Sequence, residues 1–464
     1  MRWALLLLSA LAMGLMQDKP FFWDTIQLGS KHAHWFYEQG FRSLLLPENI
    51  DSGHPPFFGL YLAAAWTLFG KSLAVSHWAM LPFVWGIILL LFPIGRYFSK
   101  TWGWLFPLVA LANPVLLTQM LLISPDAVLV CGFLLGLYGI LHQRLAAKII
   151  GGLLLAAIST RGMMVVMVLF LVDGYQRFSP HLPRQAKAYF RWLLPYLPAG
   201  FLAAGFLLYH YLQTGWIGYH AGSEWAPSFE RAGFRQILKN TVLLGWRLAD
   251  FGLVFVWLTL GLAASWRVIG KKRRLDRDSW RTAAVLFALS TALLSLTFLL
   301  YSHLHQHRYL LPAMLALQLL AFTTVVSSGL QRAWKVGLLT LMTFGPISGH
   351  FWVYPDHIAQ GWDSTLAHLP YYRLKARMID YLDEQGIPLQ QVGTAFPEIG
   401  PQYYKDLSGR ESGFAPKDLG KQRYILYSNV MNDFTDGERA RLRQNWQVEQ
   451  QYTANRITMI LYTK

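Results

Sequence analysis

Cysteine and charged residues are both scarce in this sequence of 464 residues. The single cysteine, Cys131, excludes an intrachain disulfide, so cysteine usage does not report the redox compartment. Charged residues make up 14% of the chain, well below the roughly 25% that is usual in soluble domains. Hydrophobic residues make up 54% and aromatic residues 15%. The shortage of charge and the excess of apolar residues argue against a soluble globular protein and for a membrane protein.

The basic residues are distributed in a way that excludes nucleic acid as the partner. The formal net charge is +16, but the lysines and arginines form no single patch. They fall in short clusters at every second connection between apolar runs: Arg2; Arg96 and Lys100; Arg144 and Lys148; Arg177, Arg184, Lys187 and Arg191; 271–274; Arg332 and Lys335. This is the positive-inside pattern of membrane proteins, and anionic lipid head groups are its natural partners.

Eleven apolar runs approach the length of about 20 residues that a transmembrane helix needs. The predicted spans are 3–16, 73–97, 102–122, 126–143, 148–160, 162–176, 192–212, 240–266, 282–302, 309–329 and 335–352. With the N-terminus inside, all basic clusters lie in the cytoplasm, and we expect a multi-pass protein of the inner membrane. The run 3–16 also fits a signal peptide, since Ala10-Leu11-Ala12 resembles a cleavage site. Either interpretation puts Gln17 onward outside the cytoplasm.

The stretch Pro56–Gly70 is apolar but only 15 residues long. A span there would reverse every later connection and move the basic clusters outside, so we predict an interfacial or re-entrant helix. Its aromatic residues suit the head-group boundary. The outer connections are then 17–72, 124–126, 161–162, 213–239 and 302–308, with the tail from about 354. We expect the five connections to converge on one cavity.

Residues 353–464 are polar and mixed in charge, unlike residues 1–352, which are dominated by apolar runs. The pattern predicts helices over 371–385 and 436–446, a capping box of Thr435 and Glu438, and strands over 391–395, 423–427 and 456–462. We expect a small soluble α/β domain on the outer face. It contains no phosphate loop, metal-spaced cysteines or catalytic triad, so we predict a structural or acceptor-recognising role.

Two aspartates stand where apolar runs meet the outer side. Asp24 lies among aromatic residues just beyond the first span, and Asp126 lies at the start of another. Each fits a helix-capping acid. Each also fits a catalytic acid or base, because aromatic surroundings raise the pKa of a carboxyl group and acids at membrane helix ends are site candidates. Glu48 and Asp51 are predicted to be solvated loop carboxylates.

Histidines and an arginine on the outer side are candidate ligands. His303, His305 and His307 alternate ahead of Arg308 and Tyr309. Alternating histidines on an extended segment suit a metal, but the spacing identifies no matching carboxylate. A phosphate site is favoured, in which Arg308 offers a fixed fork of donors and the histidines add hydrogen bonds.

Arg161 is an exception to the positive-inside pattern, because it lies on the predicted outer side. It is a second candidate for binding phosphate; the alternative is that it reaches lipid head groups. Lys31, with the neighbouring His32 and His34, is a further candidate. His54 is another, although the two prolines that follow it have a structural role, since they fix the backbone at the entry to the interfacial helix.

Four motifs follow one another in a specific order. They are Asp24 after the first span, His54-Pro55-Pro56 before a helix ending at Phe69-Gly70, Pro125-Asp126 opening a span, and Arg308 to Pro312 entering a late one. This order resembles the GT-C glycosyltransferases over roughly residues 1–330. The most similar groups are the bacterial lipid A galacturonosyl- and aminoarabinose-transferases and the protein O-mannosyltransferases.

The resemblance implies an α-helical integral membrane protein with a catalytic domain over 1–352 and the small domain, 353–464, outside. It implies an inverting transfer of sugar from a polyprenyl-phosphate-linked donor to a hydroxyl of a lipid, glycan or protein acceptor. Asp24 matches the family's catalytic aspartate and Asp126 its second acid. No cofactor is implied, and no spacing indicates a divalent metal.

The chemistry of these residues agrees with this function. A polyprenyl phosphate leaving group has a second pKa of about 6, so it needs cations such as Arg308 and Arg161 rather than a general acid. The alternatives are a secondary transporter or lipid flippase, and a lipid-linked glycan ligase or polymerase. Transporters tend to have internal repeats with paired broken helices near the midplane. The sequence has no such repeat, and its polar candidates gather at one face.

Overall fold

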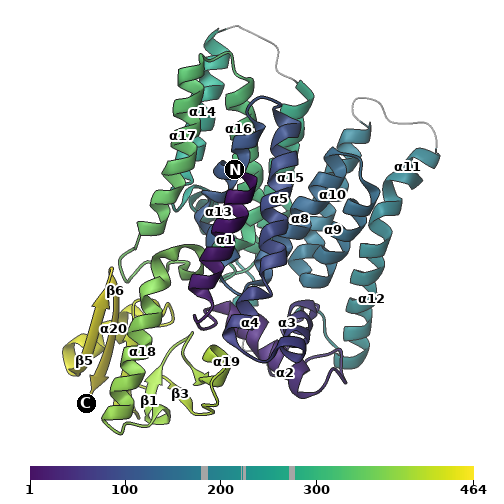
Figure 1. Ribbon diagram of the computed structural model, residues 1–464. Helices are drawn as coiled ribbons and strands as arrows, with labels where there is room; N and C mark the ends of the chain where they lie inside the picture. The colour runs from purple at the N-terminus through teal and green to yellow at the C-terminus, as the bar shows by residue number, and fades with distance from the viewer. Residues whose placement is uncertain (179–185, 221, 223–225, 271–276) are drawn as a thin grey trace.

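The computed structural model describes residues 1–178, 186–220, 222, 226–270 and 277–464 (Figure 1). Apolar helices form an elongated bundle, and a small α/β domain lies at one end of it, the end that also carries α2, α3 and α4. The basic residues Arg184 and 271–274 of the positive-inside pattern lie outside the described residues.

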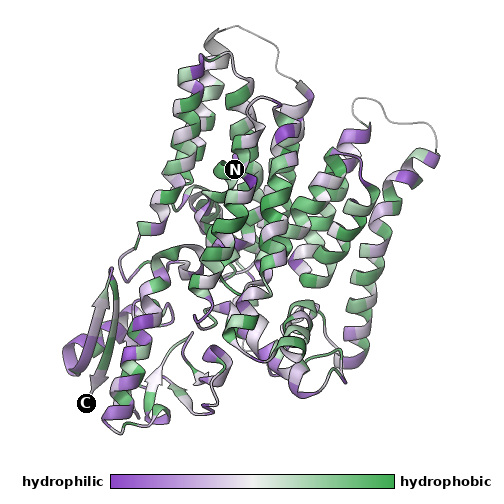
Figure 2. Cartoon of the chain, in the orientation of Figure 1, coloured by the Kyte–Doolittle hydropathy of each residue, from purple (hydrophilic) through white to green (hydrophobic). Residues whose placement is uncertain are grey.

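The bundle is built from helices between the N-terminus and residue 347. They are α1 Arg2–Met16, α2 His32–Glu38, α3 Phe57–Phe69, α4 Leu73–Trp78, α5 Leu81–Phe98, α6 Phe106–Leu111, α7 Pro114–Leu121, α8 Pro125–Leu141, α9 Leu145–Ile158, α10 Thr160–Phe178, α11 Ala186–Leu193, α12 Leu197–Thr214, α13 Phe234–Ala249, α14 Val254–Gly270, α15 Arg277–Leu300, α16 Leu311–Ser327 and α17 Arg332–Ile347. Hydrophobic residues run along these helices, whereas the α/β domain is largely hydrophilic (Figure 2).

Within the described ranges, four helical segments are long and apolar enough to cross a membrane: Leu73–Phe98, Ala186–Thr214, Asp278–Leu300 and His307–Ser327. Two bent helix pairs raise the number to six if each pair is one span, and four further apolar helices are shorter. The last of the four segments contains α16, which is buried at the centre of the bundle. The eleven spans and their orientation therefore remain a prediction.

Two predicted spans are broken rather than continuous. Over 102–122, α7 turns by 73° from the helix before it, because Asn113 caps α7 and Pro114 is its first residue. Over 240–266, α13 and α14 meet at 83°. Phe251 and Gly252 there have φ of 47° and 81°, a left-handed conformation that ends a right-handed helix. At both places the predicted span is a bent pair of helices, and a single crossing of the membrane by each pair stays a prediction.

The α/β domain consists of α18 Leu369–Glu384, β1 Val392–Thr394, β2 Gly400–Pro401, α19 Tyr403–Asp406, β3 Gly413–Pro416, β4 Tyr424–Ser428, α20 Asp436–Asn445, β5 Gln447–Ala454 and β6 Ile457–Thr463. Its six strands are ordered β2-β3-β1-β4-β6-β5, with β1 parallel to β3 and β4 and the other pairs antiparallel. The two predicted helices, the three predicted strands and the capping box of Thr435 and Glu438 are confirmed. The sequence did not predict β2, β3 and β5.

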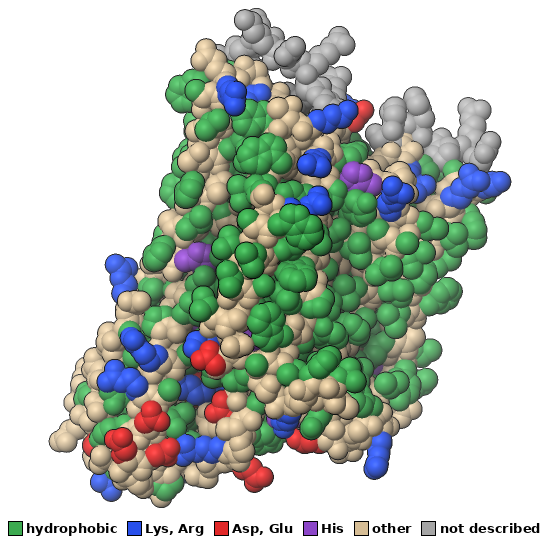
Figure 3. All heavy atoms as spheres, viewed as in Figure 1, with side chains coloured by type: hydrophobic (Ala, Val, Ile, Leu, Met, Phe, Trp, Pro, Cys, Tyr) green, Lys and Arg blue, Asp and Glu red, His purple; other side chains and the backbone are tan. Residues whose placement is uncertain are grey.

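The loop that follows α1, predicted to be the first outer loop, is packed into this domain. Phe22 and Trp23 belong to the apolar core formed by α18 and the strands. Their ring centroids lie 5.9 Å from Tyr371 and 5.2 Å from Phe396, respectively. The acidic side chains on the face drawn in Figure 3 gather mainly at this end of the molecule. The loop that follows α1 is therefore held in place by residues nearly 350 positions later in the chain.

Candidate functional site

Three carboxylates surround one buried guanidinium group. Arg308, in the turn that precedes α16, pairs through Nη2 with Asp24 and through Nη1 with Asp126 at 2.9 Å. Its Nε lies 2.9 Å from an oxygen of Asp363. Only 2% of the Arg308 side chain is exposed, so protein groups rather than water balance its charge. The expectation that Asp24, Asp126 and Arg308 meet in space is confirmed.

Asp24 is placed by an unusual local backbone. Trp23 adopts a left-handed conformation with φ of 56°. The hydroxyl of Thr25 then closes a tight turn, accepting from the backbone NH of Phe22 at 2.9 Å and donating to its carbonyl at 2.7 Å. The carboxylate of Asp24 makes no capping bond to the helical turn that follows and pairs with Arg308 instead. The capping interpretation of Asp24 is therefore wrong.

Asp126 bridges two arginines. The cap of α8 is Ser124, whose hydroxyl accepts from the backbone NH of Asp126 at 3.1 Å. This leaves the Asp126 carboxylate to accept from Arg161 at 2.6 Å and from Arg308 at 2.9 Å. The side-chain capping role predicted for Asp126 thus belongs to its neighbour.

Arg161, in the first turn of α10, points into the protein. Besides Asp126, it faces the ring of Tyr309, whose centroid lies 4.3 Å from its Cζ. The Cζ of Arg308 lies 5.0 Å from the same ring, so Tyr309 is flanked by two guanidinium groups. The alternative in which Arg161 reaches for lipid head groups is wrong.

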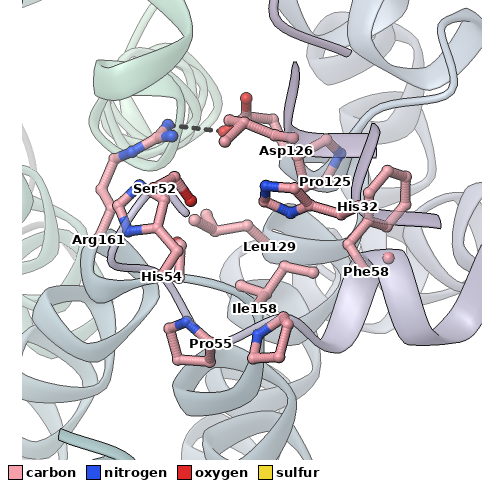
Figure 4. A pocket seen from close by; sticks show the side chains of 14 residues that line it. His32, Ser52, His54, Pro55, Phe58, Pro125, Asp126, Leu129, Ile158 and Arg161 are labelled. Carbon is pink, nitrogen blue, oxygen red and sulfur yellow. Dashed lines mark hydrogen bonds and ion pairs between the residues drawn. The ribbon is translucent and has the colours of Figure 1, made fainter. Parts of the chain in front are cut away.

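Two cavities that share lining residues lie beside this cluster. The larger, of about 120 Å³, is lined by polar groups of Asp24, His54, Arg161 and Tyr309 and by the apolar side chains Leu28, Met164, Phe229 and Leu304, among others. The smaller, of about 20 Å³, lies between Asp126, Arg161 and the His54-Pro55-Pro56 turn (Figure 4). The lining comes from all five connections that were predicted to meet, so their convergence is confirmed, although they form two adjoining cavities rather than one.

The histidines that line the cavities are neutral near pH 7. Burial lowers the pKa of His54 to about 3, and its Nδ1 lies 3.1 Å from the hydroxyl of Thr160. Burial lowers the pKa of His32 to about 4, and its Nε2 donates to the carbonyl of Ile50 at 3.0 Å. Both rings can therefore offer a hydrogen bond but no charge to a ligand.

Six candidate site residues do not line either cavity: Lys31, His34, His303, His305, His307 and Arg308. His307 pairs with Asp250 at 2.7 Å in a second buried cluster, while the ring of His305 packs 4.7 Å from that of Phe298. Lys31 lies 5.9 Å from the ring of Tyr404 in the α/β domain. Among the described residues, no group of three or more His, Cys, Asp or Glu side chains is arranged to hold a metal ion.

Asp363 is the residue of the site that the sequence did not predict. It lies between α17 and α18, in the part assigned to the separate domain, and burial raises its pKa to about 6 despite the nearby Arg308. Its backbone carbonyl accepts from the side-chain amide of Gln119 at 2.8 Å. No local sequence motif identifies Asp363, because its partners Arg308 and Gln119 lie far from it in the chain.

No protein-family model and no curated protein sequence matches the chain. Its structure resembles that of ArnT from Cupriavidus metallidurans bound to undecaprenyl phosphate, with a TM-score of 0.51 and 12% identity over 99% of this chain and 97% of that one. The apo state of the same protein gives 0.49, with the same identity and coverage. The arabinofuranosyltransferase AftD from Mycobacteria gives 0.46 and 12% over all of this chain and 40% of that one. The first likeness shows that this chain shares the fold of ArnT over nearly its whole length.

Proposed function

We propose that this chain is an integral membrane glycosyltransferase of the GT-C type. It transfers a sugar from a polyprenyl-phosphate-linked donor to an acceptor hydroxyl at the outer face of the membrane, with inversion at the anomeric carbon. The observation that carries the proposal is that a carboxylate, Asp24, and a guanidinium, Arg161, line the same cavity. The fold shared with ArnT, whose structure contains undecaprenyl phosphate, supports the choice of donor.

Asp24 is the general base in this proposal. It takes the proton of the acceptor hydroxyl while the acceptor oxygen bonds to the anomeric carbon from the face opposite the phosphate. The bond between that carbon and the phosphate oxygen breaks, and its electron pair leaves with the polyprenyl phosphate. One oxygen of Asp24 pairs with Arg308, so the other is available to the acceptor.

Arg161 is the main contact of the donor phosphate. Within the described part of the chain its hydrogen bonds all come from Nη1, to Asp126 and, at 3.5 Å, to the carbonyl of Arg308. Its Nε and Nη2 are therefore left for an anion. The neutral ring of His54 is placed to add a hydrogen bond, and the apolar side chains Met164 and Leu304 suit the first carbons of a prenyl chain.

Arg308 has a different role from the direct phosphate contact expected from the sequence. Each of its three nitrogens faces a carboxylate, those of Asp24, Asp126 and Asp363. We propose that it holds these carboxylates together against their mutual repulsion and so positions the base. Direct contact between Arg308 and the phosphate stays a prediction.

The experiment is to incubate purified protein with a panel of polyprenyl-phosphate sugars and to measure released lipid phosphate. Asp24→Asn keeps the size of the side chain and an acceptor for Arg308 but removes the base, so we expect transfer to fall by about 10²- to 10⁴-fold. Thermal unfolding is expected to stay near that of the wild type.

Asp18→Asn is the matched control, because Asp18 lies in the same loop with 71% of its side chain exposed. Its activity should equal that of the wild type. Undiminished transfer by Asp24→Asn would refute the base role. Movement of intact donor across proteoliposomes without release of lipid phosphate would favour a flippase.

A further inference from the structure

The segment 352–363 connects the bundle to the α/β domain and is folded by its own hydrogen bonds. The backbone NH of Tyr354 donates to the side-chain oxygen of Gln360 at 2.9 Å, and the side-chain amide of Gln360 donates to the carbonyl of Trp352 at 3.0 Å. The hydroxyl of Tyr354 also donates to Asp250, at the break between α13 and α14. The segment therefore has a defined conformation fixed against the bundle.

The other side of this segment is held by the α/β domain. Asn432 donates to the carbonyl of Gln360 at 2.9 Å. Asp356 accepts from Arg443 of α20 at 2.6 Å and from Tyr427 of β4 at 3.2 Å. Trp362, next to Asp363, is buried in the apolar core of the domain. The position of Asp363 thus depends on the docked domain as well as on the bundle.

Asp363 contacts the edge of Arg308 that neither of the other carboxylates reaches. A guanidinium group is planar, and its donors point in fixed directions. Asp126 and Asp24 accept hydrogen bonds from Nη1 and Nη2, and an oxygen of Asp363 lies 2.9 Å from Nε without accepting a hydrogen bond from its N–H. A carboxylate at the third edge opposes rotation of the plane, and this rotation would move Asp24 away from the cavity.

Balancing the charge of Arg308 does not require Asp363. Two carboxylates already face this arginine, and a third buried carboxylate is costly to ionise. The raised pKa of Asp363, about 6, expresses this cost. Because ionised Asp363 costs stability, its contribution to the ion pair does not explain its presence. The orientation that it imposes on Arg308 does.

We propose that Asp363 is a positioning residue of the transfer reaction: it fixes the plane of Arg308 and hence the place of Asp24, and it makes the site complete only when the α/β domain is docked. This inference rests on the proposed function. On this proposal the α/β domain takes part in the reaction by positioning Asp363, a role that the sequence of the domain does not indicate.

The test compares Asp363→Ala with Asp363→Asn in the full-length protein, using the donor that the wild type accepts. Removal of the side chain should lower kcat roughly 100-fold, the size of effect that a misplacement of about 1 Å produces. KM for the donor should change no more than about threefold, since Arg161 is untouched. Asparagine keeps an oxygen facing Arg308, so it should restore kcat to within about tenfold of the wild type. Asp383→Asn, which removes an exposed ion pair with Arg410 elsewhere in the α/β domain, should leave kcat unchanged.

A second measurement does not need activity. The pKa of Asp363 is raised on folding, so its contribution favours the folded state at low pH and is lost as the pH rises through about 6. The groups that face it are Arg308, Asp24 and Asp126. The melting temperature of Asp363→Asn, relative to the wild type, should therefore be higher at pH 7 than at pH 4.

Three results would overturn the proposal. The first is wild-type kcat in Asp363→Ala. The second is an equal loss in the alanine and asparagine variants. The third is a melting temperature of Asp363→Asn, relative to the wild type, that is lower at pH 7 than at pH 4. That result would indicate an ordinary stabilising ion pair. If the wild type transfers no sugar from any donor, the proposed function fails, and the melting experiment still decides whether Asp363 is held at a cost.

Discussion

The charge of Arg161 is the feature of the site with the most direct consequence for binding. Hydrogen bonds to a charged group contribute about 1.5–3 kcal/mol each, so Arg161→Gln should weaken binding of polyprenyl phosphate by roughly 10- to 150-fold. Calorimetry or native mass spectrometry with the lipid phosphate alone measures this effect. Arg177→Gln is the matched control, because Arg177 lies at the other end of α10 and pairs with Asp173. Equal binding by both variants would remove Arg161 from the phosphate site.

At the level of residues, the sequence predicted the site residues that lie at the junction of an apolar run and a polar turn. Asp24, Asp126 and Arg308 each lie where an apolar run meets a polar turn, which limits where their side chains can go. Asp363 has no such boundary beside it, and its role comes entirely from distant partners. His307 was predicted to face the cavity but pairs with Asp250. The alternate spacing of the histidines shows that they lie on one side of the segment but not which side faces the cavity.

At the level of elements, the break between α13 and α14 places Asp250 and Arg247 in contact with His307, the residue before Arg308. Gly252 there has φ of 81°, and an added Cβ would lie 2.5 Å from the carbonyl oxygen of Gly345. Gly252→Ala should therefore destabilise the protein by roughly 2–4 kcal/mol through backbone strain and overpacking. Thermal unfolding in detergent measures the loss.

Gly261→Ala provides the comparison within α14, because, apart from its chain neighbours and the nearby backbone of its own helix, no described residue lies within 4 Å of the added methyl group. It should be neutral or stabilise by up to about 1 kcal/mol, owing to the better helix propensity of alanine. A similar melting temperature for both variants would show that the break tolerates a side chain.

The elements themselves were predictable to different degrees. Long apolar runs such as 282–302 and 309–329 gave helices because length and composition suffice there. The breaks in 102–122 and 240–266 were missed, since both halves of each run are apolar and only local backbone geometry separates them. The polar strand β5 was missed because its pairing with β6, rather than an apolar pattern, makes it a strand.

At the level of the whole molecule, the arrangement predicts which ends share a compartment. Glu48, 74% exposed in the first outer loop, and Asp418 in the α/β domain lie at the end of the bundle that carries the cavities, and Lys100 follows α5 at its opposite end. Cysteines introduced at Glu48 and Asp418 should react with an impermeant maleimide in intact cells, and one at Lys100 only after permeabilisation. The native Cys131 is buried and should not interfere. Labelling of all three positions from one side would refute the topology.

The shared core of the first outer loop and the α/β domain has a consequence for biosynthesis. The ribosome makes Phe22 and Trp23, which directly precede Asp24, long before it makes their packing partners on α18 and the strands. The nascent chain therefore carries Asp24 without its final support until the α/β domain has been made. On the proposed mechanism, a chain whose α/β domain has not yet been made transfers no sugar.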